Sequence, residues 1–175
     1  MSSVFFEIEF RRRAAPLPVW RARVDPAQWH ALPRAVRGAG GRLVSLWGLD
    51  RSGAPAQALA CAAYAVPEGL LQVELPISID ARSYPDISDV FPCAGRMQRA
   101  TRDLSGMRAE GQADQRPWLD HGLWPAGFTP LQPGMQPPPP HAALPADYDF
   151  VRVEGDGVHE IAVGPVHAGT IEPGH

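Results

Sequence analysis

The sequence predicts an α+β domain with an antiparallel or mixed sheet and helices on one face, followed by a proline-rich spacer and a terminal β-hairpin. Three observations support this prediction: consecutive strand-like segments separated by turns, a capped helix-like segment before them, and a longer amphipathic segment after them. The chain has 175 residues and a hydrophobic content of 45%, which allow one ordinary domain with an appendage.

Four segments have the pattern of strands. Residues 4–10 (VFFEIEF) alternate between apolar and polar positions, which is the period of a half-buried strand. Residues 42–49, 57–66 and 70–77 are three further strand-like segments, and turn residues separate them. In the last segment, Leu, Val, Leu and Ile occupy every second position, so one face of the sheet is expected to be buried.

A short helix is predicted between the first two strands. Asp25 is a suitable N-cap, and Pro26 occupies the first helical position, where proline is favoured. Apolar residues follow at helical spacing until Gly38 stops the helix. Because a proline inside a helix removes a hydrogen bond, Pro33 predicts a short or kinked helix.

A second, longer helix is predicted over 87–104, and it is expected to cover the buried face of the sheet. Ser105-Gly106 supplies a C-terminal stop. Apolar or small side chains recur at a spacing of four and three residues, at Val90, Ala94, Met97, Thr101 and Leu104.

The composition changes after the α+β domain, which we assign to residues 1–129. Residues 130–146 are proline-rich, and four consecutive prolines favour a stiff, extended spacer. A ligand for an SH3-like partner, as part of a regulatory binding module, is the alternative interpretation of this segment.

A terminal region is assigned to residues 147–175. Its segments 148–153 and 158–163 alternate in polarity and flank Glu-Gly-Asp-Gly, a strong hairpin signal. A lone hairpin is marginally stable in water, so this one needs the preceding domain or a partner to pack against.

Charge and motifs exclude several function classes. A net charge of -3 provides no general field for nucleic acid, and Arg11 to Arg13 are expected to form a solvated strand end. No apolar stretch reaches the length of a membrane span. Phosphate-binding glycine loops and the motifs HExxH, CxxC and GxSxG do not occur. The N-terminus lacks the order of a secretory signal, which favours the cytoplasm.

Cysteine and histidine leave one catalytic alternative open. Cys61 and Cys93 lie in apolar stretches, where buried, reduced cysteine is common. His159 and His167, with nearby carboxylates and His175, offer ligand types suited to a transition metal, so a stand-alone metal-dependent enzyme is the rival hypothesis.

The segment 91–125 carries a resemblance to a known family. It resembles the motif FPxAxxxEREIxDLFGI of the subunit-C-like family of NADH:quinone oxidoreductase (respiratory complex I), with the HPDxRR loop and Trp-Pro ending that follow it. Gln98 and Ala100 stand where the motif has glutamates. The matching residues are Phe91, Pro92, Ala94, Arg99, Asp103, Leu104, Gly106, Asp114, Arg116, Trp124 and Pro125.

The closing stretch resembles a second family. VHEIAVGPVHAGTIEPGH is similar to the junction in the large subunit of formate-hydrogenlyase-type membrane-bound NiFe hydrogenases, where a subunit-C-like domain precedes the catalytic domain. The resemblance implies that the catalytic domain begins where this chain stops. Gly164, Pro165 and His167 match a loop that approaches quinone in the related complex I subunit, whereas Ile171 replaces its second histidine.

These resemblances imply a structural, non-catalytic module that docks on and positions a catalytic subunit. The implied partners are a hydrogenase large subunit or complex I subunit-D-like subunit and iron-sulphur subunits, with membrane contact only through them, on the inner face of the cell membrane. The NiFe centre, iron-sulphur clusters or quinone are expected only in partner or downstream parts. The expected interface or motif residues are Arg99, Asp103, Gly106, Asp114, Arg116, Trp118 and Trp124. Among them, Asp103, Asp114 and Arg116 are expected as bridging charges and the two tryptophans as aromatic anchors, although the tryptophans could equally belong to the core.

Overall fold

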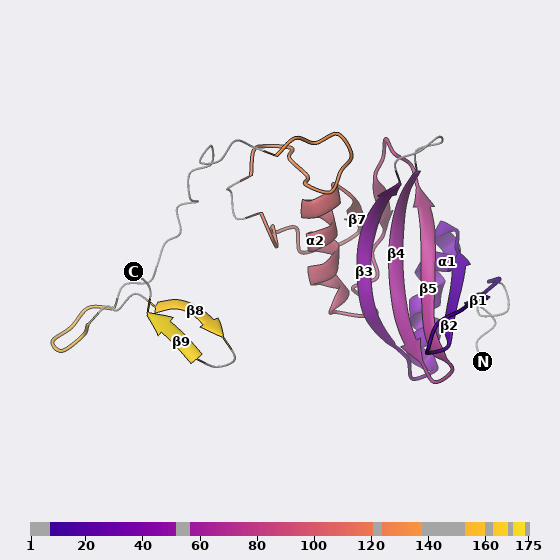
Figure 1. Ribbon diagram of the computed structural model, residues 1–175, viewed down its shortest axis with the longest axis horizontal. Coiled ribbons are helices and arrows are strands. Elements are labelled where there is room, and N and C mark those ends of the chain that lie inside the picture. Colours follow the sequence, from indigo (N-terminus) through magenta and orange to yellow (C-terminus); the bar gives the residue numbers. More distant parts are fainter. Residues whose placement is uncertain are drawn as a thin grey trace.

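The computed structural model describes residues 8–51, 57–120, 124–137, 153–159, 163–167 and 170–173 (Figure 1). The strands are β1 (Arg11–Arg13), β2 (Val19–Arg23), β3 (Arg42–Arg51), β4 (Gln57–Val66), β5 (Gly69–Ile77), β6 (Ser83–Pro85), β7 (Arg108–Glu110), β8 (Val163–His167) and β9 (Thr170–Pro173). The helices are α1 (Pro26–Gly38) and α2 (Ala94–Ser105). The architecture confirms the predicted α+β class.

The main sheet has five strands in the order β1-β2-β5-β4-β3. Strands β3, β4 and β5 form an antiparallel meander, as the sequence predicts, and β2 pairs in parallel with β5. The sheet is therefore mixed. Strand β2 was not predicted, because VWRAR follows a proline-rich stretch and is only five residues long.

The N-terminal strand lies later than predicted. Of the predicted strand 4–10, residues 4–7 lie outside the described part, and residues 8–10 are not in a strand. The observed strand β1 consists of the three exposed arginines that were expected to form a strand end. Of the predicted apolar face, Ile8 belongs to the core and Phe10 packs against it.

Helix α1 begins as predicted. Asp25 and Gln28 form a capping box, in which the Asp25 carboxylate accepts the Gln28 N–H and the Gln28 side chain accepts the Asp25 N–H. The helix continues through Pro33 to Gly38, a length of 13 residues. Pro33 is buried, so packing against the sheet compensates for the missing hydrogen bond.

Helix α2 is shorter than predicted. It starts at Ala94, and Val90 belongs to the preceding turn, where its N–H bonds to the carbonyl of Ile87. Met97 and Leu104 are only half-buried. The buried side of the helix is largely polar and consists of Ala94, Gln98, Arg99, Thr101, Asp103 and Ser105. The apolar period was misleading because loops, rather than the sheet alone, cover this helix.

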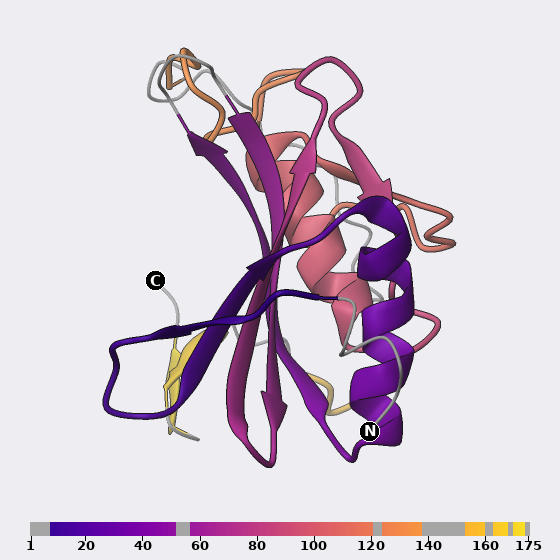
Figure 2. The ribbon, with the colours of Figure 1, turned by 90° about the vertical axis from the view of Figure 1, so that its right-hand side faces the viewer.

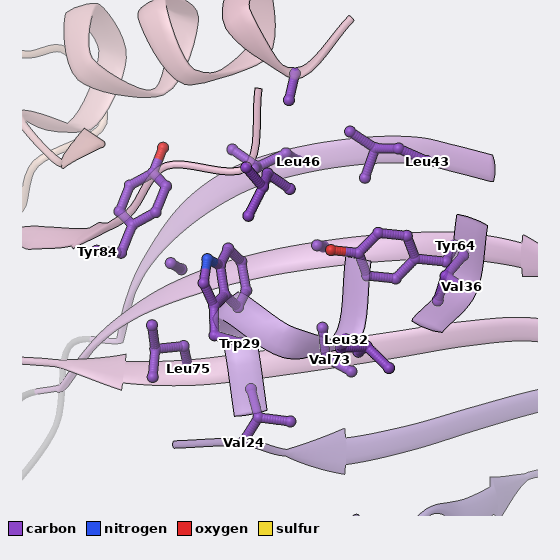
Figure 3. Packing of buried hydrophobic residues seen from close by; sticks show 14 of the residues in the cluster. Val24, Trp29, Leu32, Val36, Leu43, Leu46, Tyr64, Val73, Leu75 and Tyr84 are labelled. Carbon is purple, nitrogen blue, oxygen red and sulfur yellow. The ribbon is translucent and has the colours of Figure 1, made fainter. Parts of the chain in front are cut away.

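Both helices lie on one side of the main sheet (Figure 2). The core between them and the sheet includes Trp29, whose indole N–H bonds to the Pro85 carbonyl and whose ring meets Tyr84 edge to face at 5.8 Å. Figure 3 shows this packing. Core residues from α1 and the strands include Leu32, Val36, Leu43, Leu46, Tyr64, Val73 and Leu75.

Half of the predicted hairpin, residues 148–163, lies outside the described part. The predicted turn is present, since Val158 N–H bonds to the Gly155 carbonyl. However, Val153 and Val158 are not in strands, and residues 148–152 and 160–162 lie outside the described part. The observed hairpin pairs β8 with β9 instead. The prolines at 138–140 also lie outside the described residues.

Candidate functional site

Asp103 organises the loop that follows α2. One carboxylate oxygen, Oδ2, accepts the backbone N–H groups of Trp118 at 2.6 Å, Leu119 at 2.8 Å and Asp120 at 3.3 Å. The other oxygen, Oδ1, accepts from the Arg102 guanidinium at 3.1 Å. The side chain of Asp103 is 4% exposed, so both oxygens are satisfied by protein donors.

These donors decide the ionisation of Asp103. Burial raises the pKa of a carboxyl group, but the N–H groups of Leu119, Trp118 and Asp120, together with Arg102, outweigh it and hold the pKa of Asp103 below its usual value. The carboxylate is therefore charged at neutral pH. A charged acceptor makes stronger hydrogen bonds than a neutral one, which fixes the loop on the helix.

The Trp118 ring makes cation–π contacts with two arginines. The Arg99 guanidinium is 4.9 Å from the centre of the Trp118 ring, and the Arg96 guanidinium is 5.5 Å from it. Arg99 also contacts Asp114 Oδ2 at 3.3 Å and donates to the Arg116 carbonyl at 3.4 Å. Because the Arg99 side chain is only 10% exposed, its position is set by these contacts.

Asp114 and Arg116 form an exposed ion pair. The Arg116 guanidinium donates to the two oxygens of Asp114 at 2.9 and 2.8 Å, and Arg116 N–H donates to Oδ1 at 3.1 Å. Hydrogen bonds from Arg116 hold the pKa of Asp114 well below its usual range. The Arg116 side chain is 81% exposed, so this pair is open to an approaching surface.

Gly106 ends α2 in the left-handed conformation, with φ of 70°, where glycine has no steric penalty. Next to it, Arg82 donates to both oxygens of Asp50 and to the Ser105 carbonyl at 2.6 Å. Arg82 thus ties the end of α2 to β3. Sequence reasoning missed Arg82, because its partners are distant in the chain and no motif contains it.

Gln98 was noted only as a departure from the family motif. It is fully buried, donates through Nε2 to Asp86 Oδ1 at 2.7 Å, and accepts the Ile87 N–H at 3.2 Å. A glutamate at this position would face the Asp86 carboxylate, whereas an amide supplies both a donor and an acceptor. Glutamine therefore suits this site.

Apolar side chains are exposed on the surface of this region. Trp118 is 40% and Leu119 is 38% exposed, although both backbone N–H groups are held by Asp103. The ring of Trp124 meets Phe128 edge to face at 6.0 Å. Leu131 N–H bonds to the Leu104 carbonyl at the end of α2. We call α2 and residues 114–120 the helix-loop surface.

The structure brings together five of the seven residues expected at an interface: Arg99, Asp103, Asp114, Arg116 and Trp118. Gly106 lies at the end of the same helix, and Trp124 follows the loop, with its N–H directed to Asp120 at 3.5 Å. Arg96 and Arg102 were not anticipated, because they are not motif positions. Arg96 lies over the Trp118 ring, and Arg102 donates to Asp103 and to the Gln115 carbonyl.

The other predicted residues lie elsewhere. Gly164, Pro165 and His167 are in β8, and the placement of their side chains is outside the described part. His159 is exposed, and His175 lies outside the described residues. Among the side chains that the structure describes, His, Cys, Asp and Glu form no group of three or more that could hold a metal ion. Cys61 is buried, whereas Cys93 is exposed, which corrects the expectation that both are buried.

Comparison with known families matches this region. The family described as "Respiratory-chain NADH dehydrogenase, 30 Kd subunit" matches residues 22–139, which include strands β3 to β5, both helices and the whole helix-loop surface. The chain belongs to this family. The predicted resemblance to the subunit-C-like family of complex I is thereby confirmed.

Two curated relatives of this 30 kDa-subunit family member carry the names of a hydrogenase and of a formate hydrogenlyase. The chain is 29% identical over 108 residues to Hydrogenase-4 component G of Escherichia coli (strain K12). It is 27% identical over 109 residues to Formate hydrogenlyase subunit 5 of the same organism. The alignments cover 59% and 60% of this chain and 19% of each relative. The likeness to hydrogenlyase-type proteins is therefore also confirmed.

Solved structures share the fold of this family member. A chain of the membrane-bound sulfane sulfur reductase, an archaeal respiratory membrane complex, superposes with a TM-score of 0.57 at 17% identity, covering 67% of this chain and 72% of that one. The trypsin-resistant fragment of Nqo5 gives a TM-score of 0.51 at 13% identity, covering 64% and 93%. In the part of the present chain that the structure describes, helices are too short or too polar to cross a membrane.

Proposed function

We propose that the chain is a structural, non-catalytic module of a membrane-associated redox complex and that it docks on and positions the catalytic subunit through the helix-loop surface. The observation that carries this proposal is the exposure of Trp118 on a loop that Asp103 and Arg99 hold in place. A rigid, exposed aromatic side chain loses little entropy on binding, which is why such residues anchor interfaces.

The surface around Trp118 has the composition of a docking site. Leu119 adds apolar area, and Arg116 and Asp114 add charges at the rim. The loop backbone carries few degrees of freedom, since the Asp103 carboxylate accepts three successive N–H groups. A partner would therefore meet a surface that is already organised.

The partner in this proposal is a large catalytic subunit of the hydrogenase or NADH:quinone oxidoreductase type, accompanied by iron-sulphur subunits. The names of the two curated relatives support the hydrogenase type. The redox centres would then lie in partner or downstream parts, and the module would fix distances between subunits. It would work on the cytoplasmic side, peripheral to the membrane.

The test replaces the exposed anchors. In the purified chain, Trp118→Ala combined with Leu119→Ala is expected to weaken binding to the purified catalytic subunit by about 10- to 100-fold, since interface aromatic residues are common hot spots. The matched control combines Leu17→Ala with Ile79→Ala, which removes two other exposed apolar side chains. Surface plasmon resonance measures both affinities.

Equal loss of affinity in both double variants would show that the helix-loop surface has no special role. Deletion of residues 1–130 from the full complex gives a second test. If the complex retains hydrogenase or quinone-reductase activity after this deletion, the positioning role is wrong.

A further inference from the structure

The sheet face that points away from both helices carries a basic hollow. A cavity of about 500 Å³ opens there, and we call it the arginine basin. Figure 2 shows that the helices occupy the opposite side of the sheet. The basin is lined by Glu9, Arg11, Arg13, Arg21, Ala22, Arg23, Arg51 and Glu74.

The alternation of side chains along the strands creates this basin. In the parallel pair of β2 and β5, Ala22 lies opposite Val73 on the core side, whereas Arg21 and Arg23 lie opposite Gln72 and Glu74. Because successive side chains point to opposite faces of a sheet, these arginines and Glu74 share the outer face. None of these positions belongs to the family motif around α2.

The charges in the basin do not balance. Five arginines against two glutamates leave a net charge of +3, in a chain whose net charge is -3. Glu74 is 3% exposed and is paired with Arg21, while Arg51 approaches it at 3.7 Å. Glu9 pairs with Arg11 at 3.1 Å. The two carboxylates of the basin, Glu9 and Glu74, are therefore paired with Arg11 and Arg21.

The remaining arginines are available to a ligand. Within the described ranges, Arg13 has no ion-pair partner, and Arg23 donates only to the neutral Gln57 amide at 3.1 Å. Arg51 is 45% exposed and only loosely paired with Glu74. A guanidinium binds a carboxylate with two parallel hydrogen bonds, so each of these groups suits an anionic oxygen ligand.

The width of the basin decides between a small anion and an extended one. The cations of β2 and β3 converge, since Arg21 and Arg51 contact the same Glu74 oxygen, but Arg13 and Arg23 lie at opposite ends of the basin. Arg13 pairs with Val19, which pairs with Leu70, whereas Arg23 donates to Gln57 beside the Ala58–Ile77 pair, seven residues further along β5, or roughly 23 Å. A single phosphate cannot contact both of these arginines. Alternate side chains of an extended polypeptide are about 6.7 Å apart on one face, so a few carboxylates at alternate positions cover this distance.

We propose that the arginine basin binds an extended acidic segment of a partner polypeptide, with carboxylates at alternate positions paired to Arg13, Arg23 and Arg51. This surface is separate from the helix-loop surface and lies on the other face of the sheet. It gives the module a second contact, independent of the one in the proposed function. The ligand chemistry follows from charge complementarity and from the span of the basin.

The test measures binding of a short fluorescein-labelled peptide of alternating glutamate and serine to the full chain at low ionic strength, by fluorescence anisotropy. Arg13→Gln with Arg23→Gln is expected to weaken binding about tenfold, because two exposed ion pairs are lost while the Glu74 pairs remain. The control, Arg42→Gln with Arg108→Gln, removes two exposed arginines outside the basin and should bind like the native chain.

Two further arms make the result decisive. The glutamine counterpart of the peptide should not bind, and the charge-reversed Arg13→Glu, Arg23→Glu chain should bind the lysine counterpart instead. The proposal is overturned if the glutamate peptide does not bind or if both glutamine double variants weaken it equally. It is also overturned if inorganic phosphate at the same concentration displaces the peptide, which would identify the basin as a small-anion site.

Discussion

Asp103 shows how far a motif predicts the role of a single residue. The resemblance selected it as an interface residue, but its three N–H donors follow 15 to 17 residues later in the chain. No spacing rule connects a helix carboxylate with those groups. The same holds for Arg82, which joins the end of α2 to Asp50 of β3 and which no sequence pattern selected.

Replacing Asp103 tests its role in holding the loop. Asp103→Asn is expected to lower the free energy of unfolding at pH 7 by about 1–3 kcal/mol, because the hydrogen bonds lose a charged acceptor and an amide N–H faces Arg102. The control is Asp114→Asn, which affects an exposed pair and should change the free energy of unfolding by much less than Asp103→Asn does. Urea denaturation measures both variants.

The difference in the free energy of unfolding between the native chain and Asp103→Asn should depend on pH in a defined direction. The folded-state pKa of Asp103 lies below the ordinary value of 3.8, so its stabilisation is complete above that value and is lost as the pH falls through the folded pKa. The gap between the native chain and Asp103→Asn should therefore shrink in acid. If this stability difference stays constant down to the lowest pH at which both chains are folded, the assigned role of Asp103 is wrong.

The spacing of apolar residues predicted helix α2 but did not define its start or its whole buried side. Its existence, its glycine stop and the burial of Ala94 and Thr101 were predicted, but its start and the burial of Gln98, Asp103 and Ser105 were not, because polar contacts bury these side chains. Where α2 crosses β3, Gly48 provides the space for Thr101 and Ser105. A strand pattern alone does not reveal that a helix lies against this glycine.

A side chain at Gly48 should separate these two elements. The Cβ of Gly48→Ala would lie 2.8 Å from Met107 Sδ and 3.1 Å from Ser105 Oγ, and Met107 is fully buried. We expect a loss of about 1–3 kcal/mol in the free energy of unfolding, measured by urea denaturation. Gly95→Ala in α2 is the control, because its nearest neighbour is 3.8 Å away. It should be neutral or stabilising, and a similar loss in both variants would refute the close contact.

Hydrogen bonds connect the first residues of the predicted spacer with the end of α2. Among the residues that the structure describes, the members of the core cluster lie between Ile8 and Ala109. Leu131 N–H bonds to the Leu104 carbonyl, and the Gln132 side chain accepts from Thr129. The first residues of the predicted spacer therefore contact the end of α2, and we propose that the domain ends near residue 137.

Truncation tests this boundary. A chain that ends at residue 137 should keep the melting temperature of the full chain, since it retains the core and the contacts of Leu131. A chain that ends at residue 129 should melt about 2–5 °C lower, because the hydrogen bonds from Leu131 to Leu104 and from Thr129 to Gln132 are lost. Differential scanning calorimetry measures both. Identical melting of the two truncated chains would place the boundary at residue 129 instead.

The sequence by itself determined the α+β class, the β3-β4-β5 meander, the start of α1 and the family, because these depend on local alternation, capping residues and a contiguous motif. Only the tertiary structure decided the parallel pairing of β2 with β5 and the burial of polar side chains on α2. The same holds for the loop that Asp103 binds and for the arginine basin. These features depend on residues that are far apart in the chain and meet only when the sheet assembles, and neither periodicity nor spacing encodes such meetings.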